Sequence, residues 1–67
     1  MATVSQATPL PKIGAPATRA LNGAGFHWLE DLSGVSRSAL LSLHGVGPRA
    51  VRIVEVALAE RGLSLTA

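Results

Sequence analysis

The stretch LLSLHGVGPRAVRIV, from Leu40 to Val54, decides the fold of this chain of 67 residues. An apolar run ends at Leu43, a Gly-Val-Gly turn follows, and Pro48 is well placed to begin a new helix, because proline suits the first helical turn. Glycine at both ends of the turn permits positive φ and close approach by another backbone. Val46 between the glycines is expected to hold the turn onto the core. The stretch therefore predicts two helices joined by a tight hairpin.

An amphipathic helix is predicted over residues 48–61, directly after the hairpin. One side carries Ala50, Val54 and Leu58, which recur at helical spacing. The other side carries mostly polar residues, namely Arg49, Arg52, Val56 and Glu60. Gly62 is expected to end the helix in a left-handed conformation, followed by the apolar Leu63.

Three further helices are predicted before the hairpin. The first covers residues 15–24, with Gly25 as its left-handed cap, the second covers residues 27–33, and the third begins at Ser36, a good N-cap. The expected fold is all-α, a compact domain of four to five helices. Its predicted core comprises Ile13, Leu21, Phe26, Trp28, Leu29, Leu32, Leu40, Leu41, Val46, Ala50, Val54 and Leu58.

A weak internal repeat relates the two ends of the chain. The segment IGAPATRAL, residues 13–21, aligns without gaps on VGPRAVRIV, residues 46–54, and each copy later ends in glycine plus a large apolar residue. The pattern predicts two helix-turn-helix halves packed with approximate two-fold symmetry. The copies share few identical residues, so chance similarity is the alternative.

Composition and charge limit the classes of protein. There are no cysteines, so a disulfide or thiolate metal site is excluded, and no apolar run of about 18 residues predicts a membrane span. Residues 1–11 are expected to form a disordered arm without the pattern of a secretory signal, and residues 12–67 to form one domain. We expect a cytoplasmic protein.

Catalytic and metal-binding patterns are not apparent. His27 and His44 have no Asp or Glu at metal-ligand spacing, and His44 is interpreted as a surface histidine of the loop. Glu30 and Asp31 fit a favourable interaction with a helix dipole. Trp28 is expected to seal the core between the two halves. No enzyme activity, metal or cofactor is expected.

The hairpin favours a phosphate ligand. Amides of Gly45, Gly47 and the first helical turn are expected to point outward together, and Arg49 stands beside them. Six basic residues against four acidic ones give a net charge of only +2, so affinity for nucleic acid depends on where the cations lie.

The same stretch resembles the hairpin of the helix-hairpin-helix family, whose pattern of apolar residue, Gly-apolar-Gly and alanine is met by Leu43, Gly45, Val46, Gly47 and Ala50. Over residues 10–65 the chain is similar to the C-terminal domain of the bacterial RNA polymerase alpha subunit, a SAM-like fold with two helix-hairpin-helix-like halves. The matching stretches are RALNGAGFHWLEDL, LLSLHGVGPRAV and LAERGLSL. The resemblance implies binding to the DNA minor groove through the first helix and the hairpin, and contacts with transcription activators.

Carried over by position, the resemblance points to few side chains. Gly47 and Arg49 match hairpin positions that contact the DNA backbone, and Arg19 matches a polar DNA-contacting position on the first helix. Pro16 stands where the family has its main minor-groove arginine, and Ser42 where it often has a lysine. The chain therefore resembles the fold of that domain more than its promoter-reading function, as a free-standing relative would.

The sequence is consistent with two functions. The first is sequence-independent binding of double-stranded DNA by a monomer, through the phosphate backbone on the minor-groove side, with a role in transcription or repair. Its expected site residues are Gly45, Val46, Gly47, Arg49, Arg52, Arg19, Lys12 and Gly14. The alternative is a protein-interaction module that uses the last helix, around Arg52 and Val56, and keeps the hairpin only as a turn.

Overall fold

The computed structural model describes residues 7–67 and shows a small helical domain. It contains α1 (Ala15–Gly23), the 3-10 helix η2 (Leu29–Leu32), α2 (Arg37–Leu41) and α3 (Pro48–Ala59). Within these residues only two isolated bridges occur and no strand forms, so the all-α prediction is confirmed. The number of α-helices is three rather than four or five, because the segment predicted as a helix over residues 27–33 forms a single 3-10 turn.

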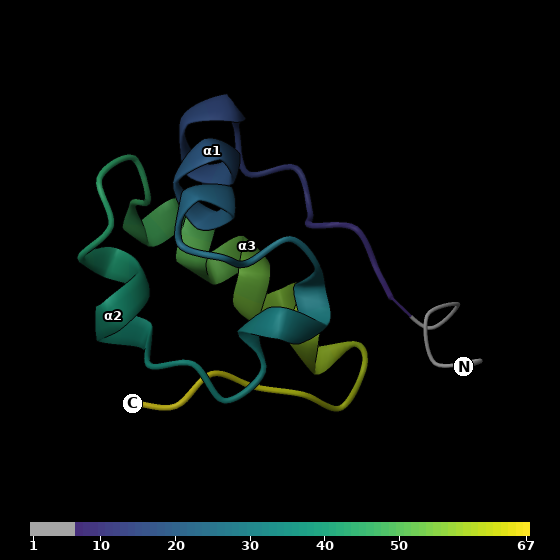
Figure 1. Cartoon of the computed structure of the whole chain (residues 1–67). Helices are drawn as coiled ribbons and strands as arrows, with labels where there is room; N and C mark the ends of the chain where they lie inside the picture. The colour runs from purple at the N-terminus through teal and green to yellow at the C-terminus, as the bar shows by residue number, and fades with distance from the viewer. Residues whose placement is uncertain (1–6) are drawn as a thin grey trace.

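Helix α3 lies at the centre of the domain, and the other helices surround it (Figure 1). α2 and η2 both pack against α3, and α1 adds Ala17 and Leu21 to the same cluster. The buried positions are all apolar: Ala17, Leu21, Leu29, Leu32, Leu40, Val46, Ala50, Val51, Val54 and Leu58. Burial of this cluster is the main source of stability, because removal of apolar surface from water is the dominant favourable contribution to folding. Among the described residues, no polar side chain is buried.

Two predicted core residues are not in the core. Trp28 is 46% exposed and Leu41 is 40% exposed. Trp28 has extended backbone angles before η2 and pairs with Pro9 in an isolated bridge, which leaves its ring at the surface. Leu41 follows the buried Leu40, and consecutive residues of a helix point about 100° apart. The prediction that Trp28 seals the core is therefore wrong.

The predicted helix ends are largely confirmed. The Ser36 hydroxyl accepts a hydrogen bond from the Ala39 N–H, as expected of an N-cap. Gly25 and Gly62 both have positive φ, at 96° and 74°. The residue after each glycine donates its N–H back into the preceding helix, from Phe26 to the Leu21 carbonyl and from Leu63 to the Leu58 carbonyl, each at 2.9 Å. α3 ends at Ala59, two residues earlier than predicted.

Backbone hydrogen bonds hold the C-terminal segment against the start of α2. The Thr66 N–H donates to the Val35 carbonyl at 2.9 Å, and the Arg37 N–H donates to the Thr66 carbonyl at 2.8 Å. The C-terminus therefore runs beside the segment that enters α2 (Figure 1). Among the described residues, no helix is both long enough and apolar enough to span a membrane.

Part of the arm predicted at residues 1–11 is attached to the domain. Residues 1–6 lie outside the described residues. The Thr8 N–H and hydroxyl donate to the two carboxylate oxygens of Glu30, at 2.8 and 2.6 Å, and the Leu29 N–H donates to the Thr8 carbonyl at 2.8 Å. Glu30 thus acts as a clamp for the start of the chain.

This clamp predicts a pH dependence. The hydrogen bonds from Thr8 lower the pKa of the Glu30 carboxyl below its ordinary value, since they favour the ionised form. The stabilisation is therefore complete above the ordinary carboxyl pKa and is lost as the pH falls through the lowered value. We expect the Thr8 amide resonance to move toward its unbound position only in that acidic range. Glu30→Gln should abolish this pH response, and an unchanged response in Glu30→Gln would contradict the assignment.

Candidate nucleic-acid interface

The first hairpin glycine packs directly against the start of α1. Gly45 has φ of 95°, and a Cβ built on it would lie 2.9 Å from the carbonyl oxygen of Pro16. Neither the backbone angle nor the space at this position suits a side chain. The expectation of positive φ and close backbone approach is therefore confirmed at Gly45, and this contact places the hairpin beside the first turn of α1.

Neither backbone conformation nor close packing requires a glycine at the second hairpin position, Gly47. Gly47 has φ of −104°, and nothing lies within 4 Å of the position of a Cβ. Gly47 therefore does not use the positive φ that glycine permits at both ends of the turn. Val46 between them is 7% exposed, and its N–H donates to the Leu43 carbonyl, so it anchors the turn as predicted. The absence of a side chain at Gly47 leaves the backbone open to the outside.

Unpaired backbone amides gather at the start of α3. The first helical bond runs from the Val51 N–H to the carbonyl of Gly47, which is the N-cap. Within residues 7–67, the N–H groups of Gly47, Arg49 and Ala50 have no acceptor, and Pro48 has no N–H to donate. Unpaired amides and the positive end of the helix dipole together favour an anion.

Among the described residues, few acidic side chains are free to neutralise the predicted site cations. Three of the four acidic side chains are engaged elsewhere: Glu30 by Thr8, Asp31 by the N–H groups of His27 and Trp28, and Glu55 by Arg37. Asp31 and Glu30 thus bind specific groups and do more than interact with a helix dipole. Among the described residues, the predicted site cations have no ion pair and are exposed: Lys12, Arg19, Arg49 and Arg52.

No protein-family model, curated protein or solved structure matches this chain. The resemblance to the helix-hairpin-helix family therefore rests on the sequence stretches quoted above.

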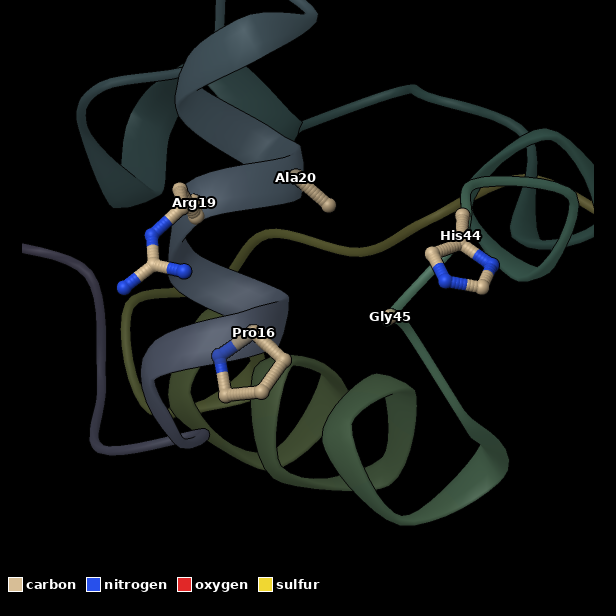
Figure 2. Close-up of a pocket in the computed structure, with 5 residues that line it drawn as sticks. All are labelled: Pro16, Arg19, Ala20, His44 and Gly45. Carbon is tan, nitrogen blue, oxygen red and sulfur yellow. The ribbon is translucent and has the colours of Figure 1, made fainter.

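A hollow separates α1 from the hairpin loop and adds one residue that the sequence did not indicate. It has a volume of about 420 Å³ and is lined by Pro16, Arg19, Ala20, His44 and Gly45. In Figure 2, His44 stands on the loop side and Ala20 points from α1 toward the hollow, while the Arg19 guanidinium lies on the α1 side, turned away from His44. Only the position of His44 directly before the hairpin glycine could have indicated this location.

The structure thus brings most of the predicted site together. The contact between Gly45 and Pro16 joins the start of α1, which carries Gly14 and Arg19, to the hairpin. Arg52 and Val56 continue from Arg49 along the exposed side of α3, at spacings of three and four residues. Within residues 7–67, no group of three His, Asp or Glu side chains could hold a metal ion.

Proposed function

We propose that the chain binds double-stranded DNA through its phosphate backbone, without reading the base sequence. The observation that carries this proposal is the open start of α3. Three amides, those of Gly47, Arg49 and Ala50, have no acceptor among the described residues, and the missing side chain of Gly47 lets a ligand approach them. Exposed Arg49 adds a cation beside these donors. Phosphate is the anion that such an arrangement favours.

The matching starts and ends of α1 and α3 support two helix-hairpin-helix-like halves. Gly14 and Gly47 are the N-caps, and each carbonyl accepts from the residue four positions later, Thr18 and Val51. The buried alanines Ala17 and Ala50 each lie three residues after the N-cap. With the glycine turns after both helices, these features favour the predicted repeat over chance similarity.

The starts of α1 and α3 would form the surface of the domain that contacts a duplex. The Gly45–Pro16 contact places them on one side of the domain, where they would contact phosphates from the minor-groove side. The cations there are few, so the slope of log K against log salt should be shallow, roughly −2 to −3. Binding by one monomer should be weak, about 10⁻⁴ to 10⁻⁶ M, as for other sequence-independent complexes. A bacterial protein of this kind would lie in the cytoplasm, on the nucleoid.

Gly47→Val tests this function without disturbing the turn. The extended backbone at Gly47 suits valine, and its Cβ would point into open space. We expect the variant to remain folded and to lose duplex binding by about tenfold or more, because the branched side chain covers several amides. Arg49→Ala should lose less affinity and should reduce the salt slope by about one unit. Binding is measured by NMR titration with a short duplex in low salt, following the amides of Gly45 and Gly47.

The control is the fold of each variant, followed by circular dichroism. Unchanged duplex affinity of folded Gly47→Val would contradict the proposal, as would equal shifts scattered over all cationic side chains. In the wild-type protein, an absence of shifts at Gly45 and Gly47 with millimolar duplex would also contradict it.

One observation favours a second candidate, a protein-interaction module. Val56 is 50% exposed on the outer side of α3, four residues after Arg52 and four before Glu60. Protein interfaces have an apolar centre and a polar rim, and Val56 between Arg52 and Glu60 would supply such a centre. If the duplex titration fails, Val56→Ser is the first variant to test for loss of a partner.

A further inference from the structure

We propose that His44 is a second phosphate-binding residue of the DNA interface, and that it acts in its protonated form. The hollow between α1 and the hairpin loop would then hold part of the duplex backbone, and DNA binding would be coupled to uptake of a proton. This inference rests on the proposed function, because it needs duplex DNA at the hairpin. It assigns a role to a side chain that the sequence alone marks only as a loop histidine.

The position of His44 is set by the residue that follows it. Gly45 is in close contact with the backbone of Pro16, so the loop cannot move away from α1 without losing this contact. His44 is therefore held at one rim of the hollow, while its exposed ring remains accessible to a ligand. Figure 2 shows the ring across the hollow from α1, where Ala20 leaves space in front of it.

The surroundings of the ring are positive or neutral. α1 contributes Arg19 as the one other charged residue of the lining, and Pro16 and Ala20 are apolar. α3 contributes no lining residue, and its nearest cation along the chain is Arg49. No carboxylate lines the hollow, so a protonated His44 has no anionic partner there within the described residues. A phosphate group would supply one.

The placement of the two basic side chains favours an extended polyanion over a small anion. In Figure 2 the Arg19 guanidinium lies across α1 from His44 and points away from it, so the two groups do not converge on one point. A single phosphate ion would not meet both groups in this arrangement. Successive phosphates of a DNA strand would meet the two groups separately. The amides at the start of α3 would bind the neighbouring part of the same backbone.

Protonation of an imidazole changes the charge of the interface within the physiological range. Histidine side chains gain a proton as the pH falls from about 8 to 5, and a bound phosphate favours the charged form. Because one more cation neutralises one more phosphate, the salt slope should steepen by about 0.9 at the lower pH. At fixed moderate salt, this corresponds to a gain in affinity of about three- to tenfold.

The two histidines of the chain provide the experiment with its own control. Duplex affinity of the full chain is measured over a range of salt at about pH 5.5 and about pH 8, for the wild type, His44→Gln and His27→Gln. His27 is also exposed, but it does not line the hollow. We expect the gain in affinity and the steeper slope at low pH in the wild type and in His27→Gln, and neither in His44→Gln. The His44 ring signals should also shift when duplex is added.

The outcomes separate this inference from the proposed function. If the wild type binds duplex and His44→Gln keeps the full pH response, or if His27→Gln loses it, the role of His44 is wrong while DNA binding stands. If no variant binds duplex at either pH, the proposed function itself is wrong. A parallel titration with inorganic phosphate should leave the His44 ring signals unchanged, and saturating shifts there would overturn the assignment to a polyanion.

Discussion

Leu40→Ala is expected to destabilise the domain by about 2–5 kcal/mol, because it removes a fully buried side chain and leaves a cavity. Leu40 is 1% exposed and belongs to the cluster that α2 and η2 form with α3. Small domains have a free energy of unfolding near the lower end of about 5–15 kcal/mol. The substitution should therefore unfold a measurable fraction of the protein in water, and urea unfolding followed by circular dichroism gives the difference.

The neighbouring leucine provides the matched control. Leu41 is 40% exposed, so Leu41→Ala deletes the same atoms from a position that loses much less contact area. Its expected cost is below about 1 kcal/mol. Equal losses from both variants would mean that α2 presents a different side to the core. The sequence-based prediction placed both leucines in the core, so this pair also measures the error of that prediction.

Gly45→Ala is the second substitution with a large expected effect. The positive φ of Gly45 costs about 1–3 kcal/mol for a residue with a side chain. In addition, the new Cβ would lie 2.9 Å from the Pro16 carbonyl oxygen, so the hairpin or α1 must move. We expect a total loss of about 2–4 kcal/mol, measured by thermal or urea unfolding. Folded Gly45→Ala should also show shifted amide resonances in the first turn of α1.

Gly47→Ala tests the same turn where both constraints are absent. Its φ of −104° is open to alanine, and no atom lies near the added methyl group. Its expected cost is that of replacing an N-cap glycine, about 0.5–1 kcal/mol. A loss as large as that of Gly45→Ala would contradict the difference between the two glycines. The difference decides which glycine can be used to test function. Only a variant at Gly47 is expected to remain folded in a binding assay.

The sequence by itself determined the local structure of this protein. Pro16 and Pro48 lie in the first turns of helices, Ser36 caps one, and Gly25 and Gly62 follow helices in left-handed conformations, all as predicted. These features depend on residues within one or two turns of each other, and glycine, proline and serine have strong preferences there. The hairpin could be recognised for the same reason, and with it most of the candidate site.

Only the tertiary structure decided which residues meet across the chain. The sequence-based prediction placed both leucines of α2 in the core, and packing against α3 buried Leu40 alone. The clamp of Thr8 by Glu30 joins residues that are 22 positions apart, and the contact of Gly45 with Pro16 joins two helix starts. No local pattern encodes such contacts, because they depend on how all the apolar faces are buried together. That same packing placed His44 at the rim of the hollow beside α1.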